Sequence, residues 1–165
     1  MKILFLDVDG VLNCSHTFQR RHNALLITNT AVKREEFAWP LGHLDEELIP
    51  RLNDIVEQTD CKIVISSSWR ISTEFPYFKG WLVYRGFKYP DAIIDKTPNL
   101  PMLDNCRGEE IKTWLVKHPE VTQYAILDDD ICDIQPVHPN NYVNTDGKEG
   151  LTNEKVKETI NLLNK

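Results

Sequence analysis

The sequence predicts an α/β domain built around a parallel β-sheet, and two observations support this. Short apolar runs recur along the chain and end in polar clusters, and helical patterns lie between them. Strands that alternate with helices are typical of parallel sheets, because parallel neighbours need a long crossover connection. A chain of 165 residues that is 41% hydrophobic is expected to form a single domain, 1–165, with a sizeable core.

The first predicted strand is the apolar run 3–6, and the residues at its end are the most informative in the chain. Four apolar residues in a row are typical of a strand buried on both faces. Asp7 and Asp9 follow at the carboxyl end, where open α/β sheets bind ligands, and Gly10 permits a sharp turn. The two acids repel each other unless a cation lies between them, so the pair indicates chemistry. The alternative is a plain surface turn, in which Asp and Gly are also common.

The remaining predicted strands also end in polar residues. Residues 61–65 lead into three serines at 66–68, and residues 124–127 lead into three aspartates at 128–130. A weaker apolar run at 92–94 completes the set.

Three helices are predicted from apolar residues at helical spacing. We expect Asp45 to N-cap a helix over 46–58, in which Pro50 is tolerable only near the start. A second helix follows Arg107, and a last helix is expected to begin at a cap formed by Asn153.

Two segments do not follow this alternation. Residues 15–40 form a long insertion straight after the first strand, and we expect a flap there. Residues 73–89 are rich in aromatic side chains, which mostly serve cores, so we expect a helix that packs on the sheet.

Composition restricts the partners and the compartment. The net charge of −6 argues against broad, non-specific nucleic-acid binding, although it leaves room for a local basic groove. The four cysteines show neither a C-x-x-C pair nor zinc spacing, so we expect free thiols in a reducing compartment. With no signal peptide and no membrane-spanning stretch, we expect a cytoplasmic protein with no membrane association and no evident obligate protein partner.

The polar clusters are expected to meet, because the carboxyl ends of parallel strands face one edge of a sheet. Asp7, Asp9, the serines at 66–68, the acids at 128–130 and Arg107 would then line one pocket. Carboxylates, a hydroxyl and a cation suit Mg²⁺ together with a phosphate. Each cluster alone has a structural alternative, a loop or a solvated helix start, but three clusters at the ends of apolar runs favour a site.

These motifs resemble those of the haloacid dehalogenase (HAD) superfamily of phosphohydrolases. Residues 7–12 match its first motif, 63–68 its second and 126–129 its fourth. The stretches 66–70 (SSSWR) and 107–111 (RGEEI) resemble a subgroup related to RNA-repair and polynucleotide-end phosphatases. The resemblance implies a Rossmann-like parallel sheet with a minimal cap or none, with residues 15–40 as a possible small flap or cap.

The resemblance also implies catalytic roles for the first two acids. Asp7 would be the nucleophile that forms an aspartyl-phosphate intermediate. Asp9 would be the general acid for the leaving oxygen and then the base that activates water.

The same resemblance implies a Mg²⁺ site built on the aspartates. Asp7, the backbone carbonyl of Asp9, and Asp129 would bind the ion, with Asp128 or Asp133 supporting it directly or through water. Mg²⁺ is thus the expected cofactor.

The phosphate-binding residues stay open between candidates. Ser66 or Ser67 is expected to donate a hydrogen bond to a phosphate oxygen. The third motif of the family is usually a lysine, and no lysine stands in the expected place before the helix. Arg107 does, and Lys96 and Lys112 are the other candidates.

We therefore expect a Mg²⁺-dependent phosphatase of phosphomonoesters, with a nucleotide or a nucleic-acid end as substrate. An open site without a large cap favours bulky substrates, and a base is expected to stack on Trp39 or an aromatic residue of 75–89. Four residues of the insertion are expected to follow a phosphate backbone, namely Arg20, Arg21, Lys33 and Arg34. The alternatives are a phosphatase of small metabolites or phosphoproteins, a receiver-like phospho-Asp signalling domain, whose motifs come in a different order, and a non-catalytic binding protein.

Overall fold

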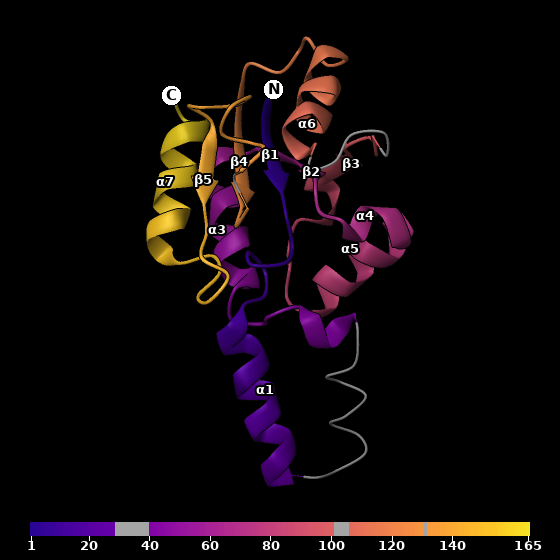
Figure 1. The fold of residues 1–165 in the computed structure, drawn as a ribbon, viewed down its shortest axis with the longest axis vertical. Coiled ribbons are helices and arrows are strands. Elements are labelled where there is room, and N and C mark those ends of the chain that lie inside the picture. Colours follow the sequence, from indigo (N-terminus) through magenta and orange to yellow (C-terminus); the bar gives the residue numbers. More distant parts are fainter. Residues whose placement is uncertain (29–39, 101–105, 131) are drawn as a thin grey trace.

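The computed structural model describes residues 1–28, 40–100, 106–130 and 132–165. In them, five strands form one parallel sheet in the order β3-β2-β1-β4-β5 (Figure 1). The strands are β1 (Lys2–Leu6), β2 (Lys62–Ile65), β3 (Ile93–Lys96), β4 (Gln123–Asp128) and β5 (Tyr142–Asn144). The predicted α/β class and parallel sheet are confirmed.

The central strand is β1, which the apolar run predicted to be buried on both faces. Leu4 and Leu6 are fully buried in the larger core cluster on one face. Ile3 and Phe5 are fully buried in a second cluster on the other face, where the Phe5 ring lies edge-on to Trp114 at 5.5 Å between centroids. The alternating side chains of this one strand therefore join both halves of the core.

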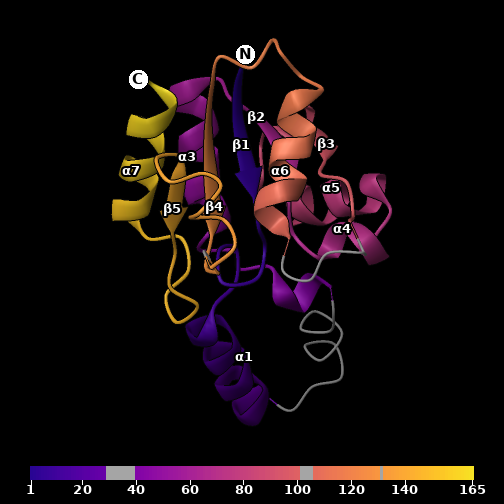
Figure 2. The same cartoon turned by 45° about the horizontal axis from the view of Figure 1, so that its top comes forward.

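Helices cover both faces of the sheet. The larger cluster packs against α3 (Ile49–Thr59), α5 (Phe75–Tyr84) and α7 (Asn153–Leu163). The smaller cluster packs against α6 (Arg107–Val116), which Figure 2 shows in front of the sheet with α3 behind it. Three short helical turns lie between these elements: η1 (Leu41–His43), α4 (Trp69–Ser72) and η2 (Pro90–Ala92).

Helix α1 (Ser15–Thr28) projects beyond the carboxyl ends of the strands in both views (Figures 1 and 2). Its base is fastened to the segment before α3, because Thr17 and Arg20 both bind the buried Asp45 carboxylate. The sequence predicted no helix here, since a projecting helix buries no continuous apolar stripe. The rest of the predicted flap, 29–39, lies outside the described residues.

Helix boundaries differ from the prediction at two places. Helix α3 begins at Ile49 rather than at residue 46, because the Asp45 carboxylate accepts a hydrogen bond from the Glu47 amide in a turn and does not cap the helix. Pro50 lies in the first turn, as expected. Helix α7 begins at Asn153, but the hydroxyl of Thr152 caps it.

The expectations of a core-packed helix in 73–89 and of free cysteines are confirmed, whereas one strand was not expected. Helix α5 packs Phe78 and Leu82 into the core, and all four cysteines are free. Strand β5 was not predicted, because three residues are too few to show a pattern. Among the described residues, no helix has both the length and the apolar character needed to cross a bilayer.

Candidate active site

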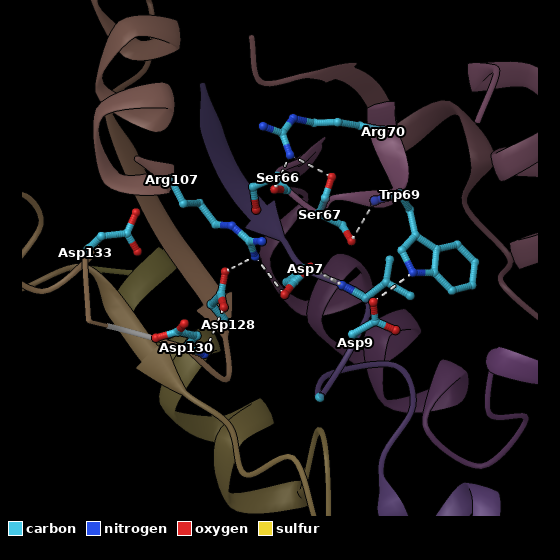
Figure 3. A network of polar contacts seen from close by, with 12 residues as sticks. Asp7, Asp9, Ser66, Ser67, Trp69, Arg70, Arg107, Asp128, Asp130 and Asp133 are labelled. Atoms are coloured by element: carbon cyan, nitrogen blue, oxygen red, sulfur yellow. Dashed lines mark hydrogen bonds and ion pairs between the residues drawn. The ribbon is translucent and has the colours of Figure 1, made fainter. Parts of the chain in front are cut away.

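The register of the sheet brings the ends of three strands to one level. Leu6 pairs with Ile65 of β2 and with Leu127 of β4. Hydrogen bonds continue one residue further, because the Asp7 amide donates to the Leu127 carbonyl and the Ser66 amide donates to the Leu6 carbonyl, both at 3.0 Å. The residues that follow these strands therefore meet at one edge (Figure 3).

Asp7 lies buried at this edge, with 5% of its surface exposed. One carboxylate oxygen accepts the Val8 amide at 2.8 Å, and the other lies 2.7 Å from Nη1 of Arg107. The same Nη1 bonds to the buried Asp128 carboxylate, so one guanidinium lies between two acids that would otherwise repel (Figure 3). Arg107 is the first residue of α6, and the helix position thus delivers the cation to the site.

The two lysines considered for this role lie elsewhere. The Lys96 ammonium donates to the backbone carbonyl of Arg70 at 2.9 Å, and the exposed Lys112 pairs with Glu109 on its own helix. Of the three candidate cations, Arg107 is the one that contacts Asp7.

Burial and charge set the protonation of this cluster. Burial and the Asp7 carboxylate raise the pKa of Asp128 to about 7, while Arg107 opposes the shift. Burial also raises the pKa of Asp129, and Asp7 adds to the shift. Burial would lower the pKa of Arg107, but Asp7 and Asp128 outweigh it and hold that pKa above its ordinary value.

Asp7, Asp128 and Asp129 form the acidic cluster, in which each residue offers an oxygen and these atoms all lie within 4.8 Å of one another. Gly10 is required beside it, because its φ is +69° and an added Cβ would lie 2.2 Å from the carboxyl carbon of Asp129. Asp133 was expected to support the metal, but its carboxylate accepts the Gly108 amide at 3.2 Å, at the start of α6.

The serines after β2 differ in their hydrogen bonds. The Ser66 hydroxyl is buried and has no hydrogen-bond partner among the described residues. The Ser67 hydroxyl accepts the Trp69 amide at 3.4 Å. A buried hydroxyl left unpaired is costly, so the unpaired Ser66 hydroxyl favours Ser66 as the donor to a phosphate oxygen, although Ser67 also keeps its hydroxyl proton.

Asp9 is exposed and faces a different set of partners. Its Oδ2 accepts the indole Nε1–H of Trp69 at 2.9 Å, and its Oδ1 accepts the side-chain amide of Asn13 at 2.8 Å. Asn13 also donates to the His43 carbonyl and accepts the Gly10 amide. Sequence reasoning missed Asn13; the signal for it was that Asn side chains hydrogen-bond nearby backbone groups in turns, as Asn13 does with Gly10.

The family described as "HAD domain in Swiss Army Knife RNA repair proteins" matches residues 3–156. The chain belongs to this family. The HAD motifs and the RNA-repair subgroup predicted from the sequence are thereby confirmed, and the protein is an enzyme, a HAD-type phosphohydrolase. The receiver-like and non-catalytic alternatives are set aside. Comparisons with curated proteins and with solved structures gave no match.

In this phosphohydrolase, the arginine of the SSSWR stretch, Arg70, holds the backbone of the serine loop in place. Arg70 is buried, and its guanidinium donates to the carbonyls of Ser66, Ser67 and Thr97 (Figure 3). It also forms a buried ion pair with Glu110 of α6. Burial lowers the pKa of Arg70 and Glu110 opposes the shift. One side chain therefore joins the loops after β2 and β3 to α6.

Arg20 and Arg21, the two basic residues of the insertion that the structure describes, pair with acids and a backbone carbonyl of the protein itself. Arg20 pairs with Asp45 and Glu47, and Arg21 pairs with Glu46 and the backbone carbonyl of Leu44. These arginines hold α1 in place, which explains their sequence pattern without a nucleic acid. The other residues of that prediction, Lys33, Arg34 and Trp39, lie outside the described residues.

A pocket of about 530 Å³ opens beside Asp9 and Asp129. The expected aromatic residues of 75–89 do not line it. Its aromatic walls come from three other parts of the chain, Phe18 of α1, His43 of η1 and Trp69 of α4.

Proposed function

We propose that this HAD phosphohydrolase is a Mg²⁺-dependent phosphomonoesterase that works through an aspartyl phosphate on Asp7 and acts on nucleotide or nucleic-acid ends. One observation carries the proposal: a buried Asp7 carboxylate ends the central strand, bonded to Arg107 and grouped with two further acids. Buried acids crowded together are costly to fold, and such clusters are found where function requires them.

The donor set of the acidic cluster fits Mg²⁺, which prefers carboxylate oxygens and binds through few protein ligands plus substrate phosphate. Asp7, Asp128 and Asp129 would hold the ion, together with the backbone carbonyl of Asp9 that the family resemblance implies. When bound, the ion supplies positive charge for the phosphoryl oxygens.

The chain's own residues then account for each step. Asp7 attacks phosphorus while the bond to the leaving oxygen breaks, and the phosphoryl group stays on Asp7. Asp9 gives a proton to the leaving oxygen, and its carboxylate then takes a proton from the water that hydrolyses the aspartyl phosphate. Ser66 donates its hydroxyl to a phosphoryl oxygen, and Arg107, kept cationic by its neighbours, adds positive charge beside it.

The substrate class rests on the RNA-repair description of the family. A nucleotide or nucleic-acid end is therefore the first substrate to test, and small metabolites and phosphoproteins are the competing outcomes.

Phosphate release from three substrate types, with and without Mg²⁺, tests the proposal. We use phosphorylated oligonucleotides, glycerol phosphate and a phosphopeptide, with Asp7→Asn as the key variant and the exposed Asp54→Asn of α3 as its control. Asp7→Asn should abolish turnover and the acid-stable labelling of the protein by ³²P, while Asp54→Asn keeps both. Near-normal turnover in Asp7→Asn would show that the nucleophile is another residue.

The metal assignment has its own matched pair of variants. Asp129→Ala removes a ligand of the acidic cluster and should raise the Mg²⁺ concentration for half-maximal activity by about 10–100-fold. Asp130→Ala removes the exposed neighbour, whose carboxylate accepts the Cys132 amide, and should leave it within about two-fold of wild type. If the two variants exchange these results, Asp130 is the ligand.

A further inference from the structure

The pocket beside Asp9 is placed to receive the part of the substrate that leaves. We call it the leaving-group pocket and define it by Asp9, Asn13, Phe18, His43 and Trp69. The leaving oxygen must reach Asp9 to be protonated, so the group attached to that oxygen enters this space. A volume of about 530 Å³ is of the size that small-molecule sites have.

Three rings line this pocket in sequence. Phe18 lies edge-on to His43 with 5.0 Å between ring centroids, and His43 lies 6.4 Å from Trp69. Trp69 is buried, whereas Phe18 keeps 40% of its surface exposed. An exposed phenyl ring at the rim of an active-site pocket offers an apolar face for a planar group.

The negative charge of the side chains that line the pocket restricts which chemical groups can bind there. Among the described residues that line it, Asp9 and Asp129 are the charged ones, and none is a lysine or an arginine. A second phosphate would therefore be repelled inside the pocket, while a neutral ring would be accepted. The nearest arginine of α1, Arg20, is already paired with Asp45 and Glu47.

We propose that the leaving-group pocket binds the base of the phosphorylated terminal nucleotide by stacking on Phe18, beside His43 and Trp69. The proposal rests on the proposed function, because it takes the leaving group to be a nucleoside. In this proposal, the enzyme recognises the terminal base by aromatic stacking, whereas the sequence had suggested recognition of the phosphate backbone by basic residues.

The test uses pairs of short oligonucleotides that differ by the terminal base alone. Within a pair, one oligonucleotide has a normal terminal nucleotide and the other has an abasic one, so their charge and backbone are equal. The first pair carries a 5′-phosphate and the second pair carries a 3′-phosphate. Wild-type protein should favour the member with the base by about ten-fold in kcat/KM in at least one pair, within the range of stacking on one ring.

Variants at Phe18 locate this preference. Phe18→Ala and Phe18→Leu should reduce the ratio to about two-fold or less, and Phe18→Trp, which restores a ring, should recover it. The control is Tyr77→Ala, which removes an aromatic ring that is 62% exposed on α5, outside the pocket; it should keep the wild-type ratio. Thermal melting of each variant confirms that the fold is retained.

The outcomes separate this proposal from the one on which it rests. Equal kcat/KM for both members of each pair, or a wild-type ratio in Phe18→Ala, overturns the base pocket while the phosphatase activity stands. A clear preference for phosphotyrosine peptides overturns it as well. If no phosphomonoester is hydrolysed, the proposed function falls. In that case, fluorescence anisotropy measures the affinity of Asp7→Asn protein for the two oligonucleotides of each pair. Equal affinities for the normal and the abasic member would overturn the proposed stacking of the base.

Discussion

At the scale of single residues, the hydrogen bonds of Asp9 are the feature with the most direct consequence for rate. Both carboxylate oxygens accept a donor, one from Trp69 and one from Asn13, so the proposed general acid has a fixed position before substrate arrives. A small displacement of such a group is costly, because proton transfer needs hydrogen-bond contact with the leaving oxygen.

Trp69→Phe tests this role of the indole N–H, because it removes the donor and keeps a ring. We expect kcat on glycerol phosphate, which carries no base, to fall about ten-fold, with KM little changed. Trp81→Phe on α5 is the control for loss of an indole elsewhere. An unchanged kcat in Trp69→Phe would show that the indole does not position Asp9.

The raised pKa of Asp128 predicts a pH dependence of the metal-free protein. The carboxyl ordinarily has a pKa of 3.8, and burial raises it to about 7 in the folded state, so the folded protein binds more protons between these values. The contribution of Asp128 to stability is therefore most favourable at low pH and is lost as pH rises towards about 7. The measurement is the melting temperature of wild type minus that of Asp128→Asn, taken without metal at pH 5 and at pH 8. This difference should be smaller, or more negative, at pH 8 than at pH 5. A difference that is the same at both pH values would contradict it.

At the scale of elements, Arg70 holds the site together from inside. Its ion pair with Glu110 has both side chains 5% exposed, and it also binds the carbonyls after β2 and β3. Arg70→Ala should lower the free energy of unfolding in urea by about 3–5 kcal/mol, because it leaves Glu110 charged and unpaired in the interior. Lys112→Ala breaks an exposed pair and should cost at most about 1 kcal/mol. Similar costs for the two variants would show that the buried pair is not a main support.

Sequence patterns predicted the longer elements that bury an apolar face and missed one helix that projects and one strand that is very short. The runs before Asp7 and Asp128 were readable as strands because both of their faces are buried. Helix α1 was missed because it projects from the sheet, and β5 because it has three residues. The start of α3 was misplaced because Asp45 binds α1 and a turn instead of the helix, which is a tertiary effect.

The candidate site was predictable to the level of strand ends but not of individual partners. Parallel register alone brings Asp7, Ser66 and Asp128 together. The contact of Arg107, rather than either lysine, with Asp7 depends on the position of α6, and the different hydrogen bonds of Ser66 and Ser67 depend on their side chains; no spacing reveals either. The same holds for the partners of Asp9, which come from a turn and a short helix.

At the scale of the whole molecule, the net charge of −6 and the pairing of Arg20 and Arg21 predict weak electrostatic attraction for nucleic acids. Between 50 and 200 mM salt, kcat/KM for a phosphorylated oligonucleotide should fall no more steeply than that for glycerol phosphate, because few lysines or arginines release counterions. Parallel salt titrations of the two substrates measure this. A steep decline for the oligonucleotide alone would point to a basic groove outside the described residues.

The central place of β1 has a consequence for biosynthesis. Strand β1 (Lys2–Leu6) is synthesised well before one of its two neighbours in the sheet, β4 (Gln123–Asp128). Until β4 has been synthesised, the apolar β1 has an open edge, which is a template for pairing with other chains. The nascent protein also lacks Asp128 and Asp129 for the same period. The candidate site therefore cannot form from the segment around β1 alone, because it needs β4 beside that strand.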